Sequence, residues 1–197
     1  MSIVEIHKGM SAELGRWLET EGLLASLSEH ERGIMTIPLG RWRHDLIEAV
    51  NWLSETVGVF AWAVSLLKSL PPYDSRFSHE ELMVRLRIGK PLKIPETLRL
   101  RPTEELQAAR QTALQWEHRS QAARHHRDAA PNDPAGGQSA VAQQAANVRK
   151  NGRLPEPIDL DFSAFGRPCA SLSREQIDQL IAISEKRAAA LSWLCGR

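Results

Sequence analysis

The stretch EAVNWLSETVGVFAWAVSLLK, residues 48–68, decides the fold that this sequence predicts. Written as a helix, it is apolar on opposite faces, and Glu55 is its one charged residue between the two ends. One face carries Val57, Phe60 and Val64, and the other carries Val59, Trp62 and Leu66. Helices that are apolar all round lie in the centre of a fold, so we expect a central buried helix over Val57–Leu67. The apolar run is too short to cross a bilayer.

The composition is that of an ordinary globular protein. The chain has 197 residues, of which 42% are hydrophobic and 25% are charged, and this length suits one domain with a substantial core. The 25 Lys and Arg residues nearly balance the 24 Asp and Glu residues, so the net charge points to neither a nucleic acid nor a membrane as partner. We therefore predict a single helical domain over residues 1–197.

The N-terminal residues and the cysteines bear on the cellular compartment. The stretch MSIVEIHKGMSAEL, residues 1–14, lacks the basic start and the continuous apolar segment of a signal peptide. Cys169 and Cys195 are too few for the disulfide framework of a secreted domain, and their spacing fits no zinc site. These features predict a cytoplasmic protein with reduced thiols.

Helix start signals recur along the chain, whereas strand signals are nearly absent. Three serines have an acidic residue or Gln three positions later, which is the spacing of a capping box. They are Ser28 with Glu31, Ser78 with Glu81, and Ser173 with Gln176. The sequence therefore predicts an all-α fold, a multi-helix bundle closed by a docked C-terminal helix.

The remaining helix limits follow from prolines and from composition. We expect helices over about 42–51, from there to Leu70 before the two prolines of PPYD, and from Thr103 to about Asp128. The stretch 90–102 contains three prolines and predicts an extended connector. Residues 129–157 have almost no large apolar side chain, so we predict a flexible insertion there.

The last helix, from Ser173, places Arg187 inside its apolar face. A guanidinium that faces a core is costly unless a carboxylate meets it. Trp193 projects from the opposite side, which predicts that this helix is covered on both sides.

Glu55 is the natural partner to propose for Arg187, and Arg110 and Glu117 border the apolar stripe of the long helix and could join the same cluster. The first interpretation is a structural ion pair that holds three helices in place. The second is a catalytic or ligand-binding group, because a buried Glu beside Arg has perturbed acidity. An open route to Glu55 would favour the second, and a sealed cluster the first.

Motifs for cofactors and metals are absent from the sequence. It contains no GxGxxG, Walker loop, HExxH or Cys pair at metal spacing. We therefore expect no cofactor and no metal.

Four blocks of the sequence resemble, in order, a known family. They are LSEHERGIMTIP, WLSETVGVFAWAV, LRLRPTEELQAARQTALQWEHR and FSAFGRPCASLSREQIDQLIAISEKRAAALSWLCG. The chain thus resembles the uncharacterised bacterial family known as domain of unknown function 4272, from roughly Trp17 to Gly196. The resemblance implies a helical cytoplasmic protein of bacterial or phage origin, implies no activity, and suggests that Glu55 and Arg187 belong to the family's pattern.

For function, we expect a non-enzymatic factor that binds another protein, for example an accessory or immunity-type protein. The alternative is a hydrolase-like enzyme in which Glu55 acts as general acid or base, with Arg110 or Arg187 holding a small anionic substrate. A third, weaker interpretation is nucleic-acid binding through the basic middle segment.

Overall fold

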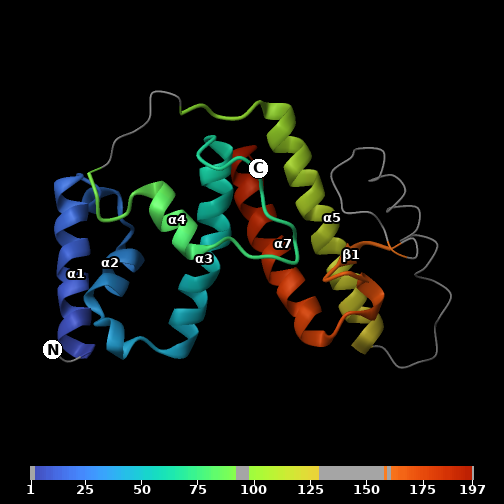
Figure 1. Cartoon of the computed structure of the whole chain (residues 1–197), viewed down its shortest axis with the longest axis horizontal. Coiled ribbons are helices and arrows are strands. Elements are labelled where there is room, and N and C mark those ends of the chain that lie inside the picture. The colour runs from blue at the N-terminus through green and yellow to red at the C-terminus, as the bar shows by residue number, and fades with distance from the viewer. Residues whose placement is uncertain (1–2, 92–97, 129–157, 159–160, 197) are drawn as a thin grey trace. The chain divides into compact units, whose positions relative to one another are not determined.

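The fold is all-α, as predicted. The computed structural model describes residues 3–91, 98–128, 158 and 161–196, and within these residues it has six α-helices and one two-stranded sheet (Figure 1). The insertion predicted at 129–157 and residues 92–97 of the proline-rich connector lie outside the described residues.

The chain divides into two compact units, 1–51 with 79–98, and 52–78 with 99–197. The first contains α1 (Ile3–Thr20), α2 (Glu29–Thr36), α4 (His79–Leu86), the start of α3 (His44–Ala63) and two short 3-10 helices, Leu24–Ser26 and Leu39–Arg41. The second contains the rest of α3, α5 (Thr103–Asp128), α7 (Arg174–Leu194), strands β1 (Ser163–Ala164) and β2 (Arg167–Pro168), and the 3-10 helix Cys169–Ser171. The single domain over residues 1–197 stays a prediction, because a compact unit need not fold independently.

The capping boxes expected at Ser28 and Ser173 both form. The Ser28 hydroxyl accepts from the Glu31 backbone N–H and the Glu31 carboxylate accepts from the Ser28 backbone N–H, and Ser173 and Gln176 do the same at α7. The third helix, α4, begins one residue after Ser78, where the sequence placed it. Local side-chain chemistry therefore located these helix starts correctly.

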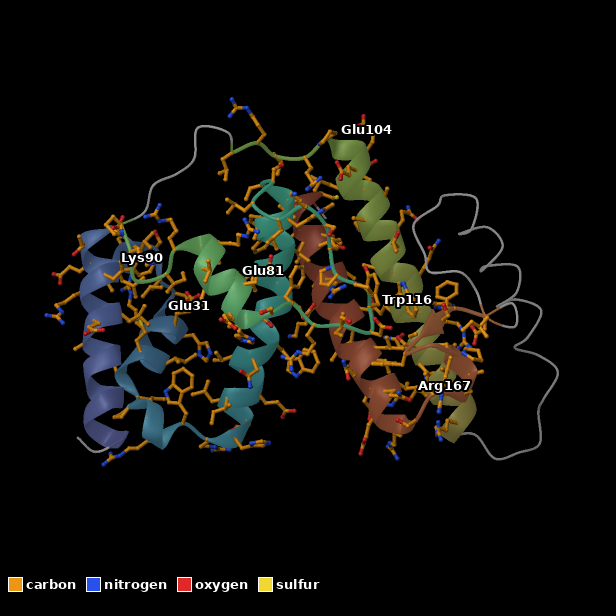
Figure 2. The ribbon with its side chains drawn as sticks, viewed as in Figure 1. Glu31, Glu81, Lys90, Glu104, Trp116 and Arg167 are labelled. Carbon is orange, nitrogen blue, oxygen red and sulfur yellow. The ribbon has the colours of Figure 1, made fainter. Side chains whose placement is uncertain are left out.

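The α5 and α7 helices pack along each other and build the core of the second unit (Figure 1). Trp116 of α5, labelled in Figure 2, is 1% exposed. Its ring stacks on Tyr73 at 5.4 Å between centroids and meets Phe162 edge-on at 5.2 Å. The α5 bounds match the prediction, and the predicted apolar face of α7 is buried. Its buried residues are Ile177, Leu180, Ile181, Ile183, Ser184, Arg187, Ala188, Ala190 and Leu191.

The α3 helix corrects the prediction of two helices that continue to Leu70. It is one helix, and it ends at Ala63. Ser65 adopts a left-handed φ of 65°, its N–H bonds the Trp62 carbonyl, and the next N–H bonds the Ala61 carbonyl, which is a Schellman cap. No glycine marks this end, so the residues before the prolines carry no local stop signal.

Arg101 satisfies the carbonyl groups at and beyond this helix end. Its backbone N–H bonds the Ala63 carbonyl at 2.8 Å, and its Nε donates to the Trp62 carbonyl at 2.8 Å. Its Nη2 donates to the carbonyls of Leu67 and Lys68. The end of α3 thus depends on a residue almost forty positions away.

Gly58 of α3 is needed for close packing. A Cβ atom at this position would lie 2.4 Å from the Cγ atom of Phe77, so the Phe77 ring sits directly on the helix backbone. Both residues are buried. Only a residue without a side chain allows this approach.

A hairpin in the second unit was not predicted. β1 and β2 pair antiparallel around Phe165 and Gly166, which have φ values of 53° and 69°. Two consecutive positive φ values characterise a type I′ turn, which suits a tight hairpin. Each strand has two residues, too few to give an alternating pattern in the sequence.

Two predictions of burial were wrong. Val57, the first residue of the predicted central helix, is 37% exposed, so this helix is not buried all round, although Val59, Trp62 and Ala63 in it are buried. Trp193 is 70% exposed, so α7 is not covered on both sides near its end. Hydrophobic periodicity identifies a helix face, but it does not show whether another element covers that face.

We predict that Gly58→Ala destabilises the protein by about 1–3 kcal/mol, because the new methyl group overpacks the contact with Phe77. Gly15→Ala is the matched control: Gly15 lies inside α1 with no atom within 4 Å of an added Cβ, so the substitution should stabilise by about 0.5–1 kcal/mol. Chemical denaturation of both variants measures the difference. Equal stability of the two variants would contradict the packing argument.

Candidate functional site

Glu55 and Arg187 meet in the interior, as the sequence predicted. The Arg187 Nε donates to Glu55 Oε2 at 2.8 Å, and both side chains are 0% exposed. The contact joins α3 to α7 across 132 positions of sequence. The lone acid of the apolar run and the lone base of the apolar α7 face are therefore partners.

Arg187 also holds the proline-rich segment that leads away from α3. Its Nη1 donates to the carbonyls of Pro71 at 2.6 Å and Pro72 at 3.3 Å, and its Nη2 donates to the Ser75 carbonyl at 2.8 Å. All three guanidinium nitrogens thus have acceptors. The prolines lack N–H groups but keep their carbonyls, and Arg187 binds these.

The other side of the cluster is also closed. Glu55 Oε1 accepts the Phe77 backbone N–H at 2.9 Å, and the rings of Tyr73 and Phe77 lie 4.8 and 5.1 Å from the Arg187 Cζ. Burial raises the pKa of Tyr73 well above its ordinary value, so the phenol stays protonated. The cluster consists of an ion pair wrapped by residues 71–77.

This geometry favours a structural role for the Glu55–Arg187 pair. A general acid or base must lie within hydrogen-bond reach of its substrate, and Glu55 has both oxygens engaged and no exposed surface. The cluster is the sealed arrangement that the sequence analysis associated with a structural ion pair.

Arg110 and Glu117 do not join the cluster. The Arg110 Nε donates to the Ser192 hydroxyl at 2.9 Å, and within the described residues neither Arg110 nor Glu117 bonds to Glu55 or Arg187. Both lie at the edge of the α5–α7 contact rather than in the core, because residues that border an apolar stripe reach the rim of a helix interface. The prediction that they could join was wrong.

The pKa of the Glu117 carboxyl is nevertheless shifted from its ordinary value. Partial burial raises its pKa, and the neighbouring carboxylate of Glu185 on α7 raises it further. Glu185 in turn accepts from Gln121 at 3.5 Å. The rim between α5 and α7 thus contains two carboxylates that repel each other.

A second buried ion pair was missed by the sequence analysis. Arg119 of α5 donates from Nε and Nη2 to both oxygens of Asp161, each at 2.6 Å, and Asp161 also accepts the backbone N–H groups of Phe162 and Ala170. The Arg119–Asp161 pair joins the hairpin segment to α5. Arg167, labelled in Figure 2, lies in this hairpin. Arg119 follows Trp116 at helical spacing, and that position was the available signal.

The two cysteines are free thiols. Cys169 is fully buried beside the Arg119–Asp161 pair, and burial raises the pKa of its thiol to about 11. At neutral pH it is therefore a protonated thiol rather than a nucleophile. Cys195 is half-buried at the end of α7.

Among the described residues, no group of three or more His, Cys, Asp or Glu side chains could hold a metal ion. In the same part of the chain, no helix is long and apolar enough to cross a membrane.

An exposed surface of the second unit is the remaining candidate. We call it the Trp193 surface; its residues are Leu53, Val57 and Phe60 of α3 and Lys186, Ala189 and Trp193 of α7. The rings of Phe60 and Trp193 pack at 5.4 Å between centroids, and Trp193 remains 70% exposed. An exposed aromatic and aliphatic surface of this kind marks an interaction site more often than a scattered apolar residue does.

Comparison with family models, with curated proteins and with solved structures gives no match to this chain. Two geometries bear on function, the sealed Glu55–Arg187 cluster and the exposed Trp193 surface.

We predict that Glu55→Gln and Arg187→Met each destabilise the protein by about 3–5 kcal/mol, because each leaves a buried charge without its partner. The double variant should lose less than the sum of the two, since neither charge is then left alone. Denaturant unfolding of the wild type and the three variants measures this coupling. A double variant that loses the full sum would show that the two side chains do not act as a pair.

We predict that Glu117→Gln raises the melting temperature at pH 7. A raised pKa means that folding favours the protonated carboxyl, so its stabilising contribution is present at low pH and is lost as pH rises from near 4.5 through the folded pKa. The gain should therefore shrink as pH falls toward 4.

Glu185→Gln is the companion variant for this test, and melting temperatures are measured across the pH range. It removes only the repulsion from the neighbour and should give a smaller gain, because burial is the larger cause of the shift. A gain for Glu117→Gln that is the same at pH 4 and pH 7 would contradict the assignment.

Proposed function

We propose that this protein is a non-enzymatic factor that binds another protein through the Trp193 surface. The observation that carries the proposal is the exposed Trp193, whose ring packs at a tilt against Phe60, while exposed Leu53 and Val57 lie at helical spacing from Phe60 along α3. Tryptophan is enriched among the residues that contribute most to protein–protein binding. Its ring gains a large contact area at low cost in side-chain entropy.

The hydrolase-like alternative has less support. It needs a substrate to reach Glu55 or Arg187, and both side chains are fully buried with their polar atoms engaged. Arg110, the other residue proposed to hold an anion, donates to Ser192. Nucleic-acid binding has no observation in its favour beyond the basic residues of the middle segment.

We further propose a cytoplasmic location and a place near the domain of unknown function 4272 family. Two free thiols suit a reducing compartment, and this supports the location. The Glu55–Arg187 contact supports the family proposal, since the resemblance had set these two residues apart as pattern residues. An accessory or immunity-type protein is one example of such a binding factor, and the resemblance itself implies no activity.

Affinity purification from a lysate of the host organism tests the binding proposal, with the wild type compared with Trp193→Ala and Leu53→Ala. We expect at least one protein to co-purify with the wild type and to be depleted with both variants, because both side chains belong to the Trp193 surface. Leu100→Ala is the matched control, since Leu100 is 61% exposed and lies outside that surface.

Recovery of the same proteins in the same amounts with the wild type and all variants would refute the proposed surface. Each variant's melting temperature is measured in parallel, so that loss of binding can be separated from loss of folding.

A further inference from the structure

The Trp193 surface has a helical repeat on both of its helices. Glu55 contacts Arg187 and Phe60 contacts Trp193, so α3 and α7 run in the same direction here. On α3, Leu53, Val57 and Phe60 are spaced by four and then three positions. On α7, Lys186, Ala189 and Trp193 are spaced by three and then four positions. This is the spacing that keeps side chains on one side of a helix over a heptad, a length of about 10 Å.

The surface carries one charge. Lys186 is exposed and forms no ion pair within the described residues, and the five other members are apolar. The adjacent acid, Glu185, is directed toward α5, where it accepts from Gln121. The surface is therefore apolar with an unneutralised positive charge at the end opposite Trp193.

From these contacts we infer that the Trp193 surface binds an amphipathic helix of another protein, one with apolar residues at heptad spacing and an acidic residue facing Lys186. The inference rests on the proposed function and adds the chemistry of the partner. A third helix packs against two parallel helices at 8–10 Å in the ordinary geometry of helix bundles, with its side chains between theirs. Charge complementarity at Lys186 selects an acidic rather than a basic helix.

Two other occupants fit less well. An added strand needs an exposed sheet edge for its backbone bonds, and the Trp193 surface is made of helices, whose backbone groups bond internally. A second copy of this chain would bring the same surface to both sides of the contact. The surface contains no carboxylate, so neither copy would offer a counter-charge to the Lys186 of the other.

Designed peptides test the inference directly on the full chain. Two labelled peptides of about three heptads carry Leu at every a and d position. One has Glu at the e and g positions and the other has Lys. Fluorescence anisotropy gives the dissociation constant of each for the wild type, Trp193→Ala and Lys186→Glu.

We expect the acidic peptide to bind more tightly than the basic one. Lys186→Glu should weaken the acidic peptide by about two- to fivefold and strengthen the basic one similarly, as is typical of a solvent-exposed charge pair. Trp193→Ala should weaken the acidic peptide by about thirtyfold, since a central Trp contributes strongly to an interface. Leu100→Ala and Lys68→Glu, both exposed and outside the surface, are the controls and should change neither constant.

The other outcomes each overturn the inference. Equal affinity for both peptides, or a preference unchanged by Lys186→Glu, rules out selection by charge, and binding of neither peptide rules out a helical partner. Concentration-dependent dimerisation that Trp193→Ala abolishes identifies a second copy as the occupant. If a host protein still depends on Trp193 while neither peptide binds, this inference fails and the proposed function stands; if no host protein depends on Trp193, the proposed function fails as well.

Discussion

The contact between Arg187 and Glu55 is the interaction on which the second unit depends. Taking a guanidinium and a carboxylate out of water costs several kcal/mol for each ion, and the pair is tolerated only when every polar atom finds a partner. Here α7 supplies the cation, α3 supplies the anion, and the segment between 71 and 77 supplies three carbonyls and one N–H. Packing these three parts in any other arrangement would leave a buried charge unmatched.

The Arg119–Asp161 pair applies the same chemistry to a different task. Asp161 accepts hydrogen bonds from Nε and Nη2 of Arg119 and from two backbone N–H groups, so it organises the hairpin and joins it to α5. Two-residue strands cannot hold a hairpin by themselves. Ionic contacts thus position irregular segments on helices. The burial of apolar residues of α5 and α7 offsets the desolvation cost of those contacts.

The parts that the sequence predicted correctly are those decided by neighbouring residues or by one charged residue on an otherwise apolar helix face. The capping serines, the bounds of α5 and the buried face of α7 follow from neighbouring residues, and Arg187 stood out because it was charged on an apolar face. The parts it missed depend on distant residues. Arg101 bonds the carbonyls at the end of α3, and the exposure of Trp193 depends on whether another element covers it. Neither fact is contained in the periodicity of a helix.

The same limit separates the two candidate sites. Glu55 and Arg187 were found because charge in an apolar run is rare, whereas the Trp193 surface was mistaken for core because an exposed apolar face and a buried one have the same sequence pattern. The burial of Cys169 has a consequence of its own. A thiol held protonated behind the hairpin reacts with an alkylating reagent only when that segment opens. The alkylation rate of Cys169 therefore reports how often the segment around the Arg119–Asp161 pair opens, and the rate of half-buried Cys195 serves as an internal reference.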